Sequence, residues 1–267
     1  MDVELARYAE LDARLVALVK DIKVLSTLSW PKRVQDAFLD AWRRGQPYLP
    51  EIKYKRFDFA ERRRELSTLA QRCDPHHPVG DYLQRTAHSW QIATMLLENL
   101  GTTRITEYSV HLYGRPGDRI AGTEVNNLAA AEHFIGAASD VMGNEALDEA
   151  DYCLSAETIA DELRHRLAQV FTDHTIRIEI DPDLVAKAAA GPTRIRLRAS
   201  TGFSEYDLSQ LLEHEAFVHS LTSLNGRAQQ NLGSLGLNSP RITATQEGLA
   251  VFSELVTGSI DITRMKR

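Results

Sequence analysis

Residues 211–221 read Leu-Leu-Glu-His-Glu-Ala-Phe-Val-His-Ser-Leu, a mostly apolar segment in which two histidines bracket a glutamate. Imidazole nitrogen is a good zinc ligand, and a carboxylate beside it can act as general base towards metal-bound water. In the familiar zinc-peptidase motif, H-E-x-x-H, the histidines lie four residues apart and share one face of a helix. The segment therefore indicates a metal-binding helix with one extra residue between the ligands.

That extra residue leaves two alternatives open. His214 and His219 are five residues apart, and five steps along an ideal α-helix separate two side chains by roughly 140°. A local widening to i→i+5 hydrogen bonding would bring both onto one face, and such π-type turns tend to occur at functional sites. Otherwise the two histidines are unrelated, and each is an ordinary hydrogen-bonded residue of the helix.

A further carboxylate, Glu247, lies downstream in the apolar run at 245–254. A charged group is seldom buried without a partner, and a metal ion would be one. Two histidines on one helix and a glutamate from a later helix are an established zinc ligand set. The alternative is a solvated acid near a helix N-terminus, where negative charge is favoured.

Alternating basic residues mark the segment at 193–198, Thr-Arg-Ile-Arg-Leu-Arg. A strand over this segment places its arginines on one face and its apolar residues on the other. If the strand borders a zinc cleft, Arg196 and Arg198 are candidates to hold a substrate carboxylate through paired hydrogen bonds. The alternative is a solvated edge strand whose charges deter aggregation.

The rest of the sequence predicts a mainly α-helical chain with a small β-sheet, an α+β fold. We expect an N-terminal helical region over 1–73 and a catalytic region over 74–267. The predicted strands are 175–180 and 193–198, joined by a short Ala-rich helix over 183–190. The predicted helices are a long opening helix that ends near residue 29, then 31–44, 59–72, 81–100, 125–142, 156–171, 206–224 and 243–259.

Composition excludes several classes of protein. The 267 residues carry a net charge of −6, with 43% apolar and 25% charged residues, which is ordinary for a globular protein and does not call for a nucleic-acid surface. No uninterrupted apolar run approaches the length of a membrane span, and the first residues are acidic where a secretory signal would be basic. Two cysteines exclude a disulfide framework. We expect a cytoplasmic protein with neither nucleic-acid nor membrane partners.

Taken together, these segments resemble the QEGLA-motif proteins, the tyrosine carboxypeptidase family that includes the microtubule-associated tyrosine carboxypeptidases. Its animal members remove a C-terminal tyrosine from tubulin. The matching segments include 194–198, the H-E-x-x-x-H motif, Leu221-Thr222, and, further upstream, Gly101-Thr102 and 112–116. Two more are Asn-Gly-Arg-Ala-Gln at 225–229 and Gln-Glu-Gly-Leu-Ala at 246–250.

The resemblance implies a zinc metallopeptidase that holds one Zn²⁺ per chain. It implies that His214, His219 and Glu247 are the metal ligands and that Glu215 is the general base. Two features depart from the family pattern. Phe217 stands where other members usually have glycine, and the chain ends at Arg267 where others continue.

The sequence therefore predicts a zinc carboxypeptidase that removes a C-terminal residue, such as an aromatic one, from a peptide or protein tail. We expect a zincin-like architecture in which the active-site helix follows an edge strand. The alternative is a catalytically silent regulator that binds a protein tail in the same cleft.

Overall fold

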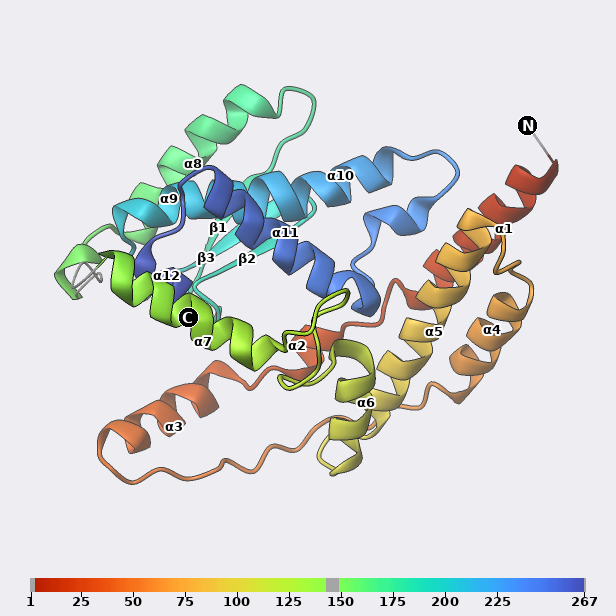
Figure 1. The fold of residues 1–267 in the computed structure, drawn as a ribbon, viewed down its shortest axis with the longest axis horizontal. Helices are drawn as coiled ribbons and strands as arrows, with labels where there is room; N and C mark the ends of the chain where they lie inside the picture. Colours follow the sequence, from red (N-terminus) through yellow and green to blue (C-terminus); the bar gives the residue numbers. More distant parts are fainter. Residues whose placement is uncertain (1–2, 143–148, 267) are drawn as a thin grey trace. The chain divides into compact units, whose positions relative to one another are not determined.

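The computed structural model describes residues 3–142 and 149–266, and these residues form two compact units. The first unit comprises Met1–Tyr113 and Asn225–Thr243, and the second comprises Gly114–Leu224 and Ala244–Arg267. Helices dominate both units, and a small sheet lies in the second (Figure 1). The predicted α+β class is confirmed. The domain boundary predicted at residue 73 falls inside the first unit.

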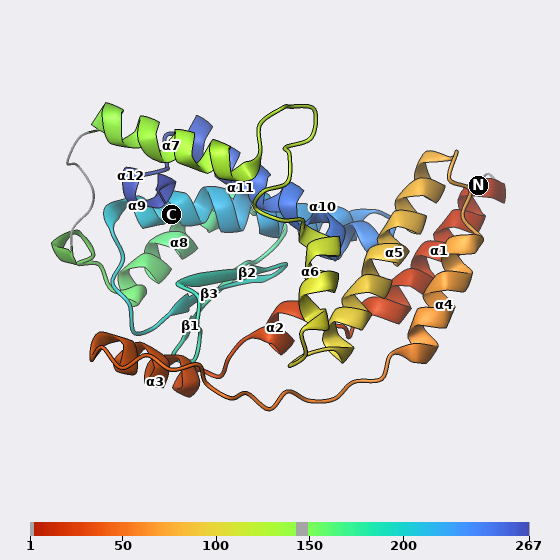
Figure 2. The same ribbon diagram turned by 60° about the horizontal axis from the view of Figure 1, so that its bottom comes forward.

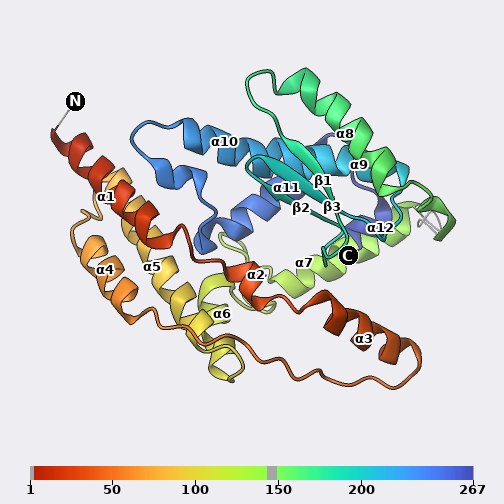
Figure 3. The same ribbon diagram turned by 180° about the vertical axis from the view of Figure 1, so that it is seen from behind.

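The first unit is a helical bundle built around three helices that pack against one another, α1, α4 and α5 (Figures 1 and 3). Leu11 and Leu15 of α1 meet Leu66 of α4 and Leu83 of α5 in a core from which water is excluded. The elements of this unit are α1 (Val3–Val19), α2 (Val24–Leu28), α3 (Lys32–Arg43), α4 (Ala60–Gln71), α5 (Pro78–Glu98), α6 (Arg104–Tyr113), η3 (Gly233–Gly236) and η4 (Pro240–Ile242).

The second unit packs helices against a three-stranded sheet (Figure 2). Its elements are α7 (Asn127–Met142), η1 (Glu149–Asp151), α8 (Ala156–Val170), β1 (Arg177–Asp181), β2 (Ala188–Gly191), β3 (Arg194–Arg198), α9 (Glu205–Leu211), η2 (Leu212–Ser220), α11 (Thr243–Val256) and α12 (Ile262–Met265). α10 (Leu221–Ala228) begins in this unit and ends in the first.

The sheet has the strand order β1-β3-β2, with β1 parallel and β2 antiparallel to β3. Ile195 and Leu197 of β3 are fully buried and face the core formed with α8 and η2. Because side chains alternate along a strand, the arginines of β3 lie on the opposite face, as the pattern predicts.

Two predictions about the sheet are wrong. The segment predicted as an Ala-rich helix over 183–190 contains no helix, and its end forms strand β2 (Ala188–Gly191). Alanine favours helix locally, but so short a helix is marginal in water, and pairing with β3 satisfies the backbone instead. As a result β3 is the central strand, not the predicted edge strand, and β2 occupies the edge.

The predicted helices agree with the structure apart from their ends and one break. The opening helix stops at Val19, and α2 begins separately at Val24. Ser155 caps α8, because its Oγ accepts a hydrogen bond from the Thr158 N–H (3.2 Å). In the described part of the chain, we find no helix with the length and apolarity required to span a bilayer.

Gly226, in the 225–229 segment, has a packing role. A Cβ placed on it would lie 2.2 Å from the backbone oxygen of Leu235. Only glycine lets α10 approach the η3 segment this closely. This part of the family-like pattern therefore supports the fold of the first unit.

Candidate metal centre

The helix that carries the two histidines is wound as a π-helix over η2 (Leu212–Ser220). Its wider turn compensates for the five-residue spacing and places both imidazole rings on one face. The ring centroids of His214 and His219 lie 4.8 Å apart, with the ring planes at 77°. Of the two alternatives that the spacing left open, the structure shows the distorted helix. The histidines are neighbours in space.

Glu247 on α11 completes a triad with them. Its Oε2 lies 3.4 Å from Nε2 of His214, and its Oε1 lies 3.6 Å from Nε2 of His219. One nitrogen or oxygen atom from each of the three residues lies within 4.8 Å of the other two. Ligands at tetrahedral zinc are about 3.3 Å apart, given metal–ligand bonds of about 2.05 Å. The donor set and its spacing therefore fit a zinc ion.

The accessibility of the triad is uneven in a way that suits an open metal site. The side chains of His214 and His219 are only 11% and 15% exposed, whereas that of Glu247 is 57% exposed. The histidines are thus fixed by their surroundings, and the carboxylate faces solvent. Three protein ligands leave a fourth position open to water or substrate, as catalytic zinc sites do.

A buried carboxylate, Glu254, orients His214. The side chain of Glu254 is fully buried, and its Oε1 lies 2.7 Å from Nδ1 of His214. Arg264 binds the same carboxylate through two nitrogens, with Nη2 2.6 Å from Oε1 and Nε bonded to Oε2. For Nδ1 to donate to Glu254 it must carry the proton, which leaves the lone pair on Nε2, facing Glu247. A metal ligand needs that tautomer.

The pKa values of this group reflect the same contacts. Burial raises the pKa of Glu254, but the hydrogen bonds with His214 and Arg264 outweigh it and hold that pKa below its ordinary value. Burial lowers the pKa of His214, but the hydrogen bond to Glu254 and the nearby charge of Glu215 raise it above the usual value. These contacts therefore favour the negative charge on Glu254 and the positive charge on His214.

Glu215 lies beside the triad in a cavity of about 320 Å³. The cavity is also lined by His214 and Glu247, so the predicted base and two predicted ligands share one space. The backbone N–H of Ala190, on the edge strand β2, donates to Oε2 of Glu215 (3.0 Å). This bond ties the carboxylate of Glu215, which belongs to the ligand helix itself, to the neighbouring strand.

The sequence profile of a protein family described as microtubule-associated tyrosine carboxypeptidase matches residues 37–267. The chain belongs to this family. The match spans both units and includes every residue of the triad. Membership of the carboxypeptidase family implies a peptidase. No curated protein and no solved structure matches the chain.

The structure does not bring the two predicted clamp residues of this carboxypeptidase into the cavity. Arg196 Nη1 lies 3.1 Å from Oδ2 of Asp181 on β1, and Arg198 Nη1 donates to the Val185 carbonyl (3.0 Å). The basic side chains that line the cavity are instead Lys187 and Arg264. Arg196 is thus paired with a neighbouring strand, and Arg198 is bound to the segment between β1 and β2.

Phe217 does not face the cavity either. Its ring stacks on that of Phe171, with centroids 6.2 Å apart, and packs on the core of the second unit. In this family member, the large side chain that replaces the usual glycine is accommodated by the core, so it does not block the metal centre.

Sequence spacing indicates that Glu254 belongs to the site, but no pattern in the sequence indicates Arg264. Glu254 follows Glu247 by seven residues, which is two helical turns along an otherwise apolar run, so both acids lie on one face of α11. Arg264 comes from the short helix α12, which no periodicity predicts.

Proposed function

We propose that this chain is a zinc-dependent carboxypeptidase that removes the C-terminal residue, with an aromatic one preferred, from a cytoplasmic peptide or protein tail. The supporting observation is the grouping of His214, His219 and Glu247 beside Glu215, in a chain that belongs to a carboxypeptidase family. The family name refers to microtubules, so tubulin tails are one substrate class to test.

In this proposal the chain's own residues handle the proton and the geometry. A bound zinc ion supplies an acidified water and polarises the scissile carbonyl. Glu215 takes the proton from the attacking water and returns it to the leaving amine. The Ala190 N–H holds one oxygen of Glu215, and the second oxygen exchanges the proton. Glu254 holds the His214 ring in the ligand tautomer throughout.

A carboxypeptidase must also recognise a free carboxylate, and a cation in the cavity can do so. Lys187 and Arg264 line the cavity. Arg264 is held by Glu254 through its Nε and Nη2. Lys187 Nζ pairs with Oδ2 of Asp207 at 2.7 Å, and we propose that its remaining N–H groups contact the substrate carboxylate. The clamp by Arg196 and Arg198 stays a prediction, and it requires both to leave their present partners.

The edge strand β2 offers a way to hold the peptide backbone. It lies beside η2, and on the edge that does not pair with β3 the Ala190 N–H already donates to Glu215, so a tail would use the other backbone groups of that edge. An extended tail can add to such an edge by main-chain hydrogen bonds. This arrangement of strand edge and ligand helix is what we propose as the zincin-like feature of the fold.

The first experiment is the metal content of the purified chain by elemental analysis, beside a His219→Ala variant. We expect about one zinc per wild-type chain and its loss in the variant. Glu215→Gln should keep the zinc and abolish the release of C-terminal residues from a peptide set ending in Tyr, Phe, Leu or Lys. Wild-type protein without zinc after reconstitution, or full turnover in Glu215→Gln, would overturn the proposal.

The same assays separate the enzyme from the alternative, a silent tail-binding regulator. A regulator would bind peptides ending in tyrosine and release no residue from them. Two sequence features favour the regulator, Phe217 and the chain end at Arg267. The Phe217 side chain packs on the core of the second unit and is not among the side chains that line the cavity.

A further inference from the structure

A second cavity, of about 480 Å³, lies within the first unit and is separate from the metal centre. Side chains from α4, α5, α6 and η4 line it, and none of them is acidic. Four of them are Arg85, His88, His111 and Arg241, which are basic or can become so. A volume of this size is in the range of small-molecule sites. The cavity therefore offers positive charge without a matching carboxylate in its walls.

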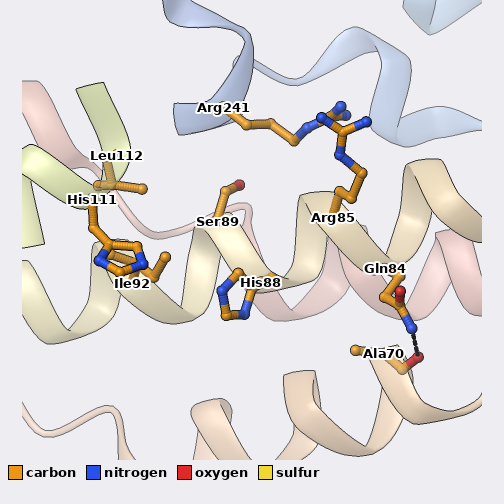
Figure 4. A pocket seen from close by; sticks show the side chains of 9 residues that line it. All are labelled: Ala70, Gln84, Arg85, His88, Ser89, Ile92, His111, Leu112 and Arg241. Atoms are coloured by element: carbon orange, nitrogen blue, oxygen red, sulfur yellow. Dashed lines mark hydrogen bonds between the residues drawn. The ribbon is translucent and has the colours of Figure 1, made fainter. Parts of the chain in front are cut away.

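The positive charge is concentrated at one end of the cavity. Figure 4 shows the side chains of Arg85, from α5, and Arg241, from η4, both reaching towards the same end of the cavity. Two like charges at close range repel each other unless a negative group lies between or beside them. The fold nevertheless brings them together from positions 156 residues apart in the chain.

The protein itself satisfies these two groups poorly. Arg85 Nη1 lies 3.5 Å from Oδ2 of Asp81, in a pair whose side chains are 62% and 44% exposed. Such a long and exposed pair contributes little. Arg241 Nη1 donates to Thr86 Oγ1 at 3.4 Å, and the guanidinium lies over the Tyr82 ring at 5.9 Å. Within residues 3–142 and 149–266, Arg241 forms no ion pair.

Each guanidinium has five N–H donors, so most of them point to no protein acceptor. A planar oxyanion, such as a carboxylate or a phosphate, accepts two parallel hydrogen bonds from one guanidinium. Two guanidinium groups at one end of the cavity offer two such forks to the head of an oxyanion.

The other end of the cavity is apolar. Ile92 is buried and Leu112 is half-buried, and Figure 4 shows both near His111, away from the arginine pair. Ser89 lies between the two ends. A ligand that fills the space is therefore an elongated molecule with a charged head and an apolar body.

We propose that this cavity binds a small organic anion, a carboxylate or a phosphate monoester with an apolar body, whose head lies between Arg85 and Arg241. An acidic peptide would supply carboxylates as well. The apolar end next to Ile92 and Leu112 favours the small molecule, because an acidic segment would leave that end without a partner. The proposal does not depend on zinc or on peptidase activity.

Isothermal titration of the 267-residue chain tests this with four probes: phenyl phosphate, inorganic phosphate, phenol and a tri-glutamate peptide. We expect phenyl phosphate to bind more tightly than either of its parts. Arg85→Gln and Arg241→Gln should each weaken it about tenfold or more, because each removes a charge-assisted pair. Leu112→Ala should weaken phenyl phosphate and leave inorganic phosphate unchanged.

Two control variants locate the binding. Arg43→Gln removes one positive charge from α3, where Arg43 is 71% exposed and pairs with Asp40, and it should bind as wild type does. His219→Ala excludes binding of the phosphate to metal, and it should also bind as wild type does. Melting temperatures of all variants confirm that they are folded.

Three results would overturn the proposal. One is wild-type affinity in both Arg85→Gln and Arg241→Gln. The second is no binding of phenyl phosphate by the wild-type chain at millimolar concentration. The third is a tri-glutamate peptide that binds more tightly than phenyl phosphate and depends on the same arginines, because the ligand would then be an acidic peptide.

Discussion

Replacing Glu254 by glutamine tests whether this buried carboxylate sets the chemistry of His214. The substitution keeps the shape of the side chain and removes its charge. Glu254 now accepts hydrogen bonds on both oxygens, from Nδ1 of His214 (2.7 Å) and from two nitrogens of Arg264. A glutamine has only one oxygen, so its NH₂ group must face one of these donors.

Either orientation of the amide is unfavourable for metal binding. If the NH₂ faces His214, Nδ1 becomes an acceptor, the proton moves to Nε2, and the lone pair needed by the metal is lost. If the NH₂ faces Arg264, it opposes the N–H donors of the guanidinium, and the glutamine side chain is no longer held in position to orient His214. Loss of such an outer hydrogen bond typically reduces metal affinity by about 10–100-fold. This is about 1.4–2.7 kcal/mol of binding free energy.

The loss of the ion pair also lowers the stability of the metal-free protein. Breaking a buried pair costs about 3–5 kcal/mol. Arg264 is 39% exposed, so water replaces part of the interaction, and we expect about 1–3 kcal/mol. The destabilisation should appear without zinc, which separates it from the change in affinity.

The assay is competition for zinc against a chromogenic chelator, together with melting curves with and without zinc. Glu213→Gln is the matched control. Glu213 precedes His214 on the same π-helix, and its Oε2 accepts a hydrogen bond from Ser253 Oγ (2.8 Å) without touching either histidine. The control should bind zinc as the wild type does. If Glu254→Gln binds zinc within twofold of wild type, Glu254 does not orient His214 and our reasoning is wrong.

Three further predictions test other parts of the structure. Burial raises the pKa of Asp12 more than the hydrogen bonds from Ser234 lower it, so the first unit should lose stability as the pH rises from about 4, the unfolded value, through the folded pKa. Asp12→Asn should be the more stable protein at pH 7 and lose this advantage near pH 3; tryptophan fluorescence can follow it, because all three tryptophans lie in the first unit. Lys187→Met should raise KM for C-terminal peptides about tenfold or more, whereas Arg196→Met should leave KM unchanged. The opposite result would support Arg196, not Lys187, as the contact for the substrate carboxylate. Gly226→Ala should destabilise the first unit by about 1–3 kcal/mol in urea titration, and an unchanged midpoint would show that α10 can move away from Leu235.

Residue chemistry predicted the metal centre better than it predicted the surroundings of that centre. His214, His219 and Glu247 could be predicted as ligands because zinc binds imidazole and carboxylate groups. The five-residue spacing of the two histidines left one question open, whether the helix is wound as an α-helix or a π-helix. Local sequence does not reveal winding, because the choice between α and π is made by the packing of the whole helix. The structure places the triad together, and its affinity for zinc stays a prediction.

The parts that sequence reasoning missed depend on pairing between distant segments. Ala188–Gly191 is a strand because β3 offers a partner, which no count of helix propensity includes. The alternation of β3 predicted which face Arg196 occupies. It did not predict that Asp181 on the neighbouring strand would form an ion pair with Arg196. The sequence shows Phe217 where the resemblance leads one to expect glycine, but not that its ring stacks on that of Phe171.

The order in which the two units become complete during synthesis follows from their interleaving. The first unit needs Asn225–Thr243, because η3 anchors α1 through hydrogen bonds from Ser234 to Asp12. Its N-terminal helices therefore leave the ribosome more than a hundred residues before their last partner. Glu247 emerges only four residues after Thr243, a fraction of a second at about 5–20 residues per second. The last segment of the bundle thus emerges just before Glu247, so the triad is completed only after every segment of the first unit has left the ribosome.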